Sequence, residues 1–277
     1  MKVFFITLLF VCASLRAQEG RIWDAHSAYV IPEKRWEVGL FQAFRYGYSE
    51  GYEYSTHPIW FFIVPNLSIK KSSGEILGYK TASRLRGYYP TPLLNMVSKT
   101  GIGGLIDPGL TIPPLVGLSG SIIGSRNIYG FDYSISAGVD IGITSGKLDH
   151  RSNIDLPMIY HRMGVFFNGW GLSWGLDIQK KVKENIRLHV DFDIRFLPGL
   201  SDKNSDHFYN MFNGESSLEH KFLIIWSRSS NFRIITGYKL VTGQFPYGVD
   251  TRVLPYIPML EKWVPIFELQ WAGKAFN

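Results

Sequence analysis

Apolar and polar side chains alternate without a fault over residues 186–196, and this pattern predicts a β-strand with two different faces. Successive side chains of an extended chain point to opposite sides, so all the apolar residues of this stretch share one face. The arginine, histidine and aspartate side chains share the other face. We therefore expect this strand to separate an apolar environment from a polar one.

The same alternation recurs along the chain and predicts about twelve strands, with ten as the alternative. Asn168-Gly169 is the strongest hairpin signal, and short polar stretches at residues 72–74 and 125–127 indicate two more turns. Short turns between successive strands predict an antiparallel up-and-down sheet. The expected strands cover residues 36–48, 54–64, 66–70, 75–88, 115–124, 128–143, 156–167, 170–179, 186–196, 218–226, 231–241 and 263–271.

Residues 90–114 interrupt this series with a long segment that contains several prolines and glycines. Residues 92–97 have the composition of a short helix, with Thr91 as its cap. A loop of this length without structure of its own is uncommon, so we expect the segment to pack inside the barrel or against its rim.

The composition of the two faces indicates which solvent each one meets. A soluble sandwich or a ligand-binding barrel also alternates, but here the polar face carries very small residues such as Gly171, Ser173 and Gly175. Small side chains suit the concave inside of a narrow barrel, whereas glycines on a solvated outer strand would only weaken the sheet. The apolar face is rich in large aliphatic and aromatic residues over lengths that suffice to cross a bilayer. These features favour an all-β fold, an antiparallel up-and-down transmembrane β-barrel.

The start of the chain is typical of a secretory signal peptide. Lys2 precedes a short apolar stretch, and the expected cleavage follows Ala17, which leaves residues 18–277 as a single barrel domain. Cleavage would remove Lys2 and Arg16 from the 29 basic residues, so 27 would face 23 acidic residues, a net charge of +4. It would also remove Cys12, the only cysteine, so the mature chain would have no disulfide and no cysteine-based zinc site. No cluster of basic residues is interleaved with exposed aromatics, so we expect no nucleic-acid partner.

The expected signal peptide, the dyad alternation, the short hairpin turns and the aromatic last strand, residues 267–271, together resemble the bacterial outer-membrane β-barrel proteins. The resemblance covers nearly all of the mature chain and is one of class, without a motif that defines a single family. It implies residence in the outer membrane of a Gram-negative bacterium and contact with outer-membrane lipids. The chain departs from the usual pattern at its end, where Asn277 follows Phe276.

Charged residues of both signs fall on the face that is expected to point inward. We predict that they pair across a barrel of only about 24 Å backbone diameter and leave the lumen narrow or largely closed. His189, Asp191 and Asp193 have the chemistry of a cation site, but Arg187 and Arg195 flank them, so a ladder of ion pairs is the preferred interpretation, without metal or cofactor. The predicted lumen-lining residues are Arg45, Lys80, Arg84, Arg86, Asp132, Asp140, Asp177, Arg187, His189, Asp191, Asp193, Arg195, Arg233, Lys239 and Glu268.

One short motif raises the question of catalysis. Residues 150–153 resemble the His-x-Ser-Asn element of outer-membrane lipid A 3-O-deacylases, which would make His150 the base and Ser152 the nucleophile. A polar turn is the preferred interpretation, because no acidic partner can be identified downstream. We therefore predict that the protein is not an enzyme.

Three functions remain compatible with the sequence. The barrel is a narrow channel for small solutes, a closed structural barrel that binds a protein partner at its rim, or a lipid hydrolase. The sequence favours the first two and does not specify the solute, the partner or the oligomeric state.

Overall fold

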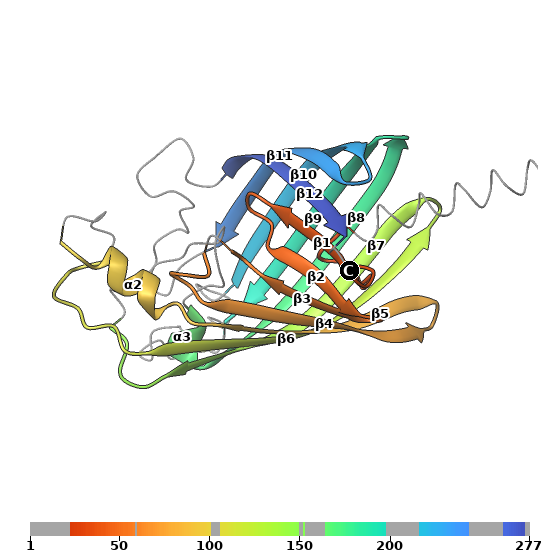
Figure 1. Cartoon of the computed structure of the whole chain (residues 1–277). Helices are drawn as coiled ribbons and strands as arrows, with labels where there is room; N and C mark the ends of the chain where they lie inside the picture. Colours follow the sequence, from red (N-terminus) through yellow and green to blue (C-terminus); the bar gives the residue numbers. More distant parts are fainter. Residues whose placement is uncertain are drawn as a thin grey trace, which may run out of the picture.

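The computed structural model describes residues 23–58, 60–100, 106–149, 152, 164–197, 216–243 and 263–274. In this part of the chain, twelve antiparallel strands form one closed up-and-down β-barrel, as predicted (Figure 1). Each strand pairs with its neighbours in the sequence, and β1 pairs with β12 to close the sheet. The strands are β1 (Arg35–Gly39), β2 (Phe44–Ser49), β3 (Tyr52–Thr56), β4 (Asn66–Ile76), β5 (Tyr79–Tyr88), β6 (Leu115–Ile128), β7 (Phe131–Thr144), β8 (Trp170–Lys183), β9 (Ile186–Phe196), β10 (Ser216–Ser229), β11 (Phe232–Gly243) and β12 (Trp263–Lys274).

The two ends of the barrel differ in the length of their connections. At one end, here called the turn end, two-residue turns join β2 to β3, β4 to β5, β6 to β7, β8 to β9 and β10 to β11. At the other end, here called the loop end, the connections are longer and include α2 (Thr91–Val97) and α3 (Gly164–Asn168). Both helices lie at the left end of the barrel in Figure 1. None of the helices in the described part of the chain is both long and apolar enough to cross a membrane.

The face assignment of residues 186–196 agrees with the burial of β9. Asp191 is fully buried and His189 is 6% exposed, whereas Phe192 and Ile194, on the opposite face, are 37% and 48% exposed. Large apolar side chains cover the outer face of other strands in the same way, as at Ile122, which is 68% exposed. The barrel is therefore polar inside and apolar outside, the inverse of a soluble globular domain.

The predicted strand at residues 36–48 is wrong, because the chain turns within it. Residues 40–43 connect β1 to β2, and the backbone N–H groups of Phe41 and Gln42 donate to Glu268 Oε1 at 3.3 and 2.7 Å. Glu37 pairs with Arg45, eight residues further on, so odd-numbered residues point inward in both strands. Phe41 and Gln42 interrupt the alternation of apolar and polar residues, but it resumes in the same phase, and this hides the turn.

Most of the strand predicted at residues 156–167 lies outside the described part of the chain, and its described end is helical. Residues 153–163 lie outside the described part of the chain, and residues 164–168 form α3. Asn168 is therefore the last residue of a helix and does not belong to a hairpin turn, and Gly169 after it has a positive φ of 89°, as is common just past the end of a helix. The barrel nevertheless has twelve strands, as predicted, because residues 36–48 supply two strands and β7 pairs directly with β8.

Other element boundaries are shifted from their predicted positions. Residues 54–64 contribute only β3, which ends at Thr56. The turns expected at residues 72–74 and 125–127 lie further along, at Leu77-Gly78 and Tyr129-Gly130, so each of these hairpins is longer than predicted. In both turns the glycine has a positive φ, as a two-residue hairpin turn requires.

The helix expected at residues 92–97 is confirmed as α2, but its cap differs. Pro90 occupies the N-cap position without a side-chain hydrogen bond, and Thr91 Oγ1 instead accepts the backbone N–H of Leu115 at 2.8 Å. The hydroxyl therefore ties the helix to the start of β6.

A buried apolar cluster fills the barrel interior at the loop end, where α2 and α3 meet the inner faces of β5, β6 and β7. The Tyr88 and Phe166 rings pack edge to face at 6.1 Å. A Cβ at Gly117 would lie 2.0 Å from Tyr88 Cζ, and a Cβ at Gly142 would lie 2.5 Å from the Val165 carbonyl oxygen. Glycines on the inner wall thus allow the cluster to approach the sheet. Its members are Val64, Tyr88, Leu93, Leu94, Val97, Ile106, Ile112, Leu115, Val165 and Phe166.

Candidate functional site: the charged lumen

The structure places all fifteen residues predicted to line the lumen on the inner face of their strands. Nine are buried, and five are partly exposed. Lys80, near the turn end, is exposed and holds its ammonium group 5.1 Å from the centre of the Tyr29 ring. The buried residues are Arg45, Asp140, Asp177, Arg187, His189, Asp191, Arg233, Lys239 and Glu268, and the partly exposed ones are Arg84, Arg86, Asp132, Asp193 and Arg195.

Five further inner-face charges of the described residues form ion pairs and were missed by the sequence analysis. Lys239 Nζ lies 2.7 Å from Glu219 Oε2, and Lys221 Nζ lies 2.7 Å from Asp191 Oδ2. These residues could have been identified from the alternation, because each one lies an even number of positions from other inward residues of its strand. The five are Glu37, Glu53, Lys70, Glu219 and Lys221.

Residues 23–32, here called the lumen segment, lie inside the barrel. The backbone carbonyl of Trp23 accepts hydrogen bonds from Arg45 and from Arg233, at 3.2 and 3.1 Å. Lys70 Nζ donates to the carbonyls of Ser27 and Tyr29 at 3.2 and 2.8 Å. These donors stand on β2, β4 and β11, so the segment is held from different sides of the wall.

Further contacts hold the lumen segment on β3, β5 and β6. The backbone N–H of Ala28 donates to Ser125 Oγ at 2.8 Å, and that of Ile31 donates to Glu53 Oε2 at 3.2 Å. Arg84 donates to the carbonyl of Ala25. Polar atoms of the backbone, which water would otherwise solvate, are thus satisfied by side chains of the wall.

The Trp23 side chain anchors the lumen segment near the turn end. Its indole is 5% exposed and lies between two guanidinium groups, those of Arg35 and Arg233, at 5.2 and 4.5 Å from the ring. Cations over an indole face are attracted by the ring quadrupole, most strongly where water is excluded. The anchor therefore combines apolar burial with charge.

A network of buried charges of alternating sign lies beneath the lumen segment. Arg45 pairs with Glu37 and with Glu53, both at 2.8 Å, and Glu53 also lies 3.3 Å from Lys70 Nζ. All four side chains are at most 4% exposed. Arg45 is the only predicted lumen residue in this network, which is distinct from the ladder predicted around His189 on β9. The network binds the lumen segment and also braces the wall.

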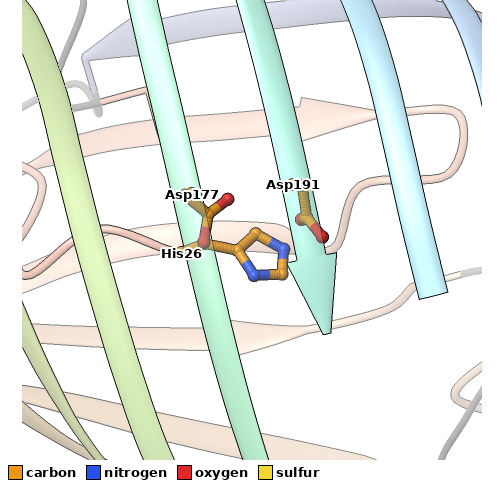
Figure 2. A group of neighbouring side chains, drawn as sticks. All are labelled: His26, Asp177 and Asp191. Carbon is orange, nitrogen blue, oxygen red and sulfur yellow. The ribbon is translucent and has the colours of Figure 1, made fainter. Parts of the chain in front are cut away.

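His26 of the lumen segment meets two wall carboxylates, Asp177 of β8 and Asp191 of β9. One ligand atom from each of the three residues lies within 4.8 Å of the others. Figure 2 shows the imidazole beside both carboxylates, which project from neighbouring strands. The cation site considered from the sequence comprised His189, Asp191 and Asp193. The group found here instead keeps Asp191 and combines it with Asp177 and His26.

The motif at residues 150–153 is only partly described. Ser152 is buried, and its hydroxyl donates to the Asp149 carbonyl oxygen at 2.6 Å. His150 lies outside the described residues. The hydroxyl is thus engaged in a local turn, and the absence of enzymatic activity stays a prediction.

Comparisons with known proteins were made at three levels. No protein-family model matches the chain, and no curated protein matches it. Among solved structures, it is similar to the outer membrane channel DcaP of Acinetobacter baumannii, with 12% sequence identity and a TM-score of 0.39 over 83% of this chain. LpxR from Salmonella typhimurium shows 10% identity and a TM-score of 0.38, with 90% of this chain and 78% of LpxR covered. The chain spans 62% of the length of DcaP.

The strand pairing described above defines the present chain as a closed twelve-stranded antiparallel up-and-down β-barrel. The strand pairing shows this class of fold, and no particular family is identified.

Proposed function

We propose that the protein is an outer-membrane β-barrel whose polar lumen is closed at rest by the lumen segment, and that it passes small solutes when this segment moves. The apolar outer face supports the membrane location, because side chains such as Ile122 and Phe267 are more than half exposed and would otherwise face water. Outer-membrane lipids are then its constant partners. The expected signal peptide provides the route of export.

The observation that carries the proposal is the way the lumen segment is held. A barrel that is only structural can be filled by the side chains of its own wall. Here a separate stretch of backbone crosses the lumen and is attached by hydrogen bonds to β2, β4, β6 and β11. Such a segment can be displaced without breaking the sheet.

The two ends of the lumen are filled by groups of different polarity. Apolar side chains of α2 and α3 fill the loop end, whereas the lumen segment fills the region toward the turn end with polar contacts. Polar contacts exchange readily with water, so the lumen segment is the better candidate for a movable element. A partner at the rim, if there is one, would act on this equilibrium.

Planar-bilayer recording tests the closure. We expect small or intermittent conductance from the purified protein and a larger, steadier conductance after deletion of residues 23–32. Ala28 and Ala82 pack together with Ile123, so a disulfide between Ala28→Cys and Ala82→Cys should suppress openings, and a reductant should restore them. Heat-modifiable gel mobility would verify that each variant is folded. A large steady current from the unmodified protein, or a folded deletion variant with unchanged conductance, would contradict the proposal.

A further inference from the structure

The contact between His26 and the two wall carboxylates has the composition of a metal site. His26 offers an imidazole nitrogen, and Asp177 and Asp191 each offer a carboxylate oxygen, all within 4.8 Å of one another. The backbone at His26 is itself fixed, because its N–H donates to Asp24 Oδ1 at 2.9 Å. The three groups come from the lumen segment, β8 and β9, so whatever they bind connects the segment to the wall (Figure 2).

A second observation points to a ligand at this place. Asp191 is fully buried, and within the described part of the chain its Oδ1 atom has no hydrogen-bond donor. A buried carboxylate oxygen without a donor is costly, and such atoms call for an explanation such as an ion. Oδ2 of the same carboxylate lies 2.7 Å from Lys221 Nζ. The ammonium group therefore pairs with Oδ2, and Oδ1 remains available to bind a ligand.

The surroundings of the two carboxylates resemble the outer shell of a metal site. His189 Nε2 lies 2.8 Å from Asp177 Oδ1, and Lys221 lies beside Asp191 in the corresponding way. In metal centres, carboxylate ligands are commonly oriented by such hydrogen-bonding neighbours. His189 and Lys221 would hold both carboxylates in place whether or not the segment is seated.

We propose that His26, Asp177 and Asp191 bind a divalent transition-metal ion of the zinc class, which fastens the lumen segment to the barrel wall. One imidazole nitrogen and two carboxylate oxygens suit Zn²⁺ and its neighbours, whereas Ca²⁺ and Mg²⁺ prefer ligand sets made of oxygen alone. Metal binding itself can be measured without reference to the proposed function. Only the expected consequence of binding, closure of the lumen, rests on that function.

Metal binding to the purified, full-length, metal-stripped protein tests the site. We expect one Zn²⁺ per chain in calorimetric titration, with an affinity at least about tenfold lower for His26→Ala and for Asp177→Asn. His57→Ala is the matched control, because His57 lies in the connection after β3 with its Nε2 3.1 Å from the Phe41 carbonyl oxygen, and the affinity of this variant should equal that of the unmodified protein. The visible absorption of bound Co²⁺ gives a second readout that needs no variant, since an imidazole and carboxylate site changes the spectrum of the aquo ion.

The outcomes separate the site from the closure. Absence of zinc binding, or equal binding by the unmodified protein and folded His26→Ala, would overturn the metal site and indicate that His26 lies near the carboxylates without sharing a metal ion with them. If zinc binds as expected, we also expect Zn²⁺ to reduce the openings seen in planar bilayers and a chelator to increase them. Zinc binding without any effect on openings would overturn the fastening role. A large conductance that is present with and without zinc would refute the closure itself.

Discussion

Arg45 holds two carboxylates and a backbone carbonyl at the same time, and it shows how single residues stabilise this barrel. Its guanidinium bonds Glu37 and Glu53 and also the carbonyl of Trp23, with 1% of its own side chain exposed. Burying such charges is costly, and the network is tolerable only because each charge is paired and hydrogen-bonded. Removal of one member therefore leaves the others uncompensated.

We expect Arg45→Met to lower the free energy of unfolding by about 3–5 kcal/mol, because two carboxylates would remain buried without their shared cation. Urea titration of the protein in lipid vesicles measures this change. Arg126→Met is the matched control, since Arg126 is exposed on β6, and its effect should stay within about 0.5 kcal/mol. Addition of Glu37→Gln and Glu53→Gln to Arg45→Met should recover part of the loss. Equal effects of Arg45→Met and Arg126→Met would show that the network contributes nothing.

The strands differ in how well the sequence predicts them, and the difference has a physical cause. Period-two alternation defines the faces of β7, β8 and β9 because one side meets hydrocarbon and the other a polar lumen. The break between β1 and β2 is hidden because paired residues such as Glu37 and Arg45 are an even number of positions apart, so the alternation resumes in the same phase after the turn. At residues 164–168 the apolar run forms α3, which packs into the loop end, and apolar content alone does not distinguish a helix from a strand over so few residues.

The lumen segment could not be predicted from the sequence for a different reason. It shows no period, and the atoms by which the wall holds it are largely backbone carbonyls and N–H groups, as at Trp23, Ser27 and Ala28. Every residue carries such atoms, so they leave no compositional signal. His26 is the exception, but its partners Asp177 and Asp191 are more than a hundred residues distant in the chain. The fifteen charged residues predicted to point inward do lie on the inner face, but the sequence did not reveal that the wall binds the lumen segment.

The register of β9 gives the prediction at the scale of the element. We expect Phe192→Arg to reduce assembly into lipid vesicles, since a charge in the hydrocarbon would cost up to about 2–4 kcal/mol near the midplane. Asp193→Asn, at the next residue on the inner face, is the control and should assemble like the unmodified protein. The folded fraction is read from heat-modifiable gel mobility. Equal yields for the two variants would contradict the assignment of the faces.

The whole molecule is asymmetric along its axis, and this asymmetry predicts its orientation. All five two-residue turns lie at one end, whereas the long connections with α2 and α3 lie at the other. Outer-membrane barrels have short turns on the periplasmic side and longer loops on the outside. The lumen segment leads into β1 at the turn end, so it would act from the periplasmic side, while the apolar cluster would close the outer mouth.

Labelling of single cysteines tests this orientation in cells that produce the protein. Phe62 is 85% exposed in the connection after β3 at the loop end, and Glu184 is exposed in the turn between β8 and β9. We expect a membrane-impermeant maleimide to label Phe62→Cys in intact cells and Glu184→Cys only after the outer membrane is permeabilised. Because both sites are exposed, both should react equally in purified protein, which controls for reactivity. The reverse pattern would show that the long loops face the periplasm, and labelling of both sites in intact cells would show that the barrel does not separate the two compartments.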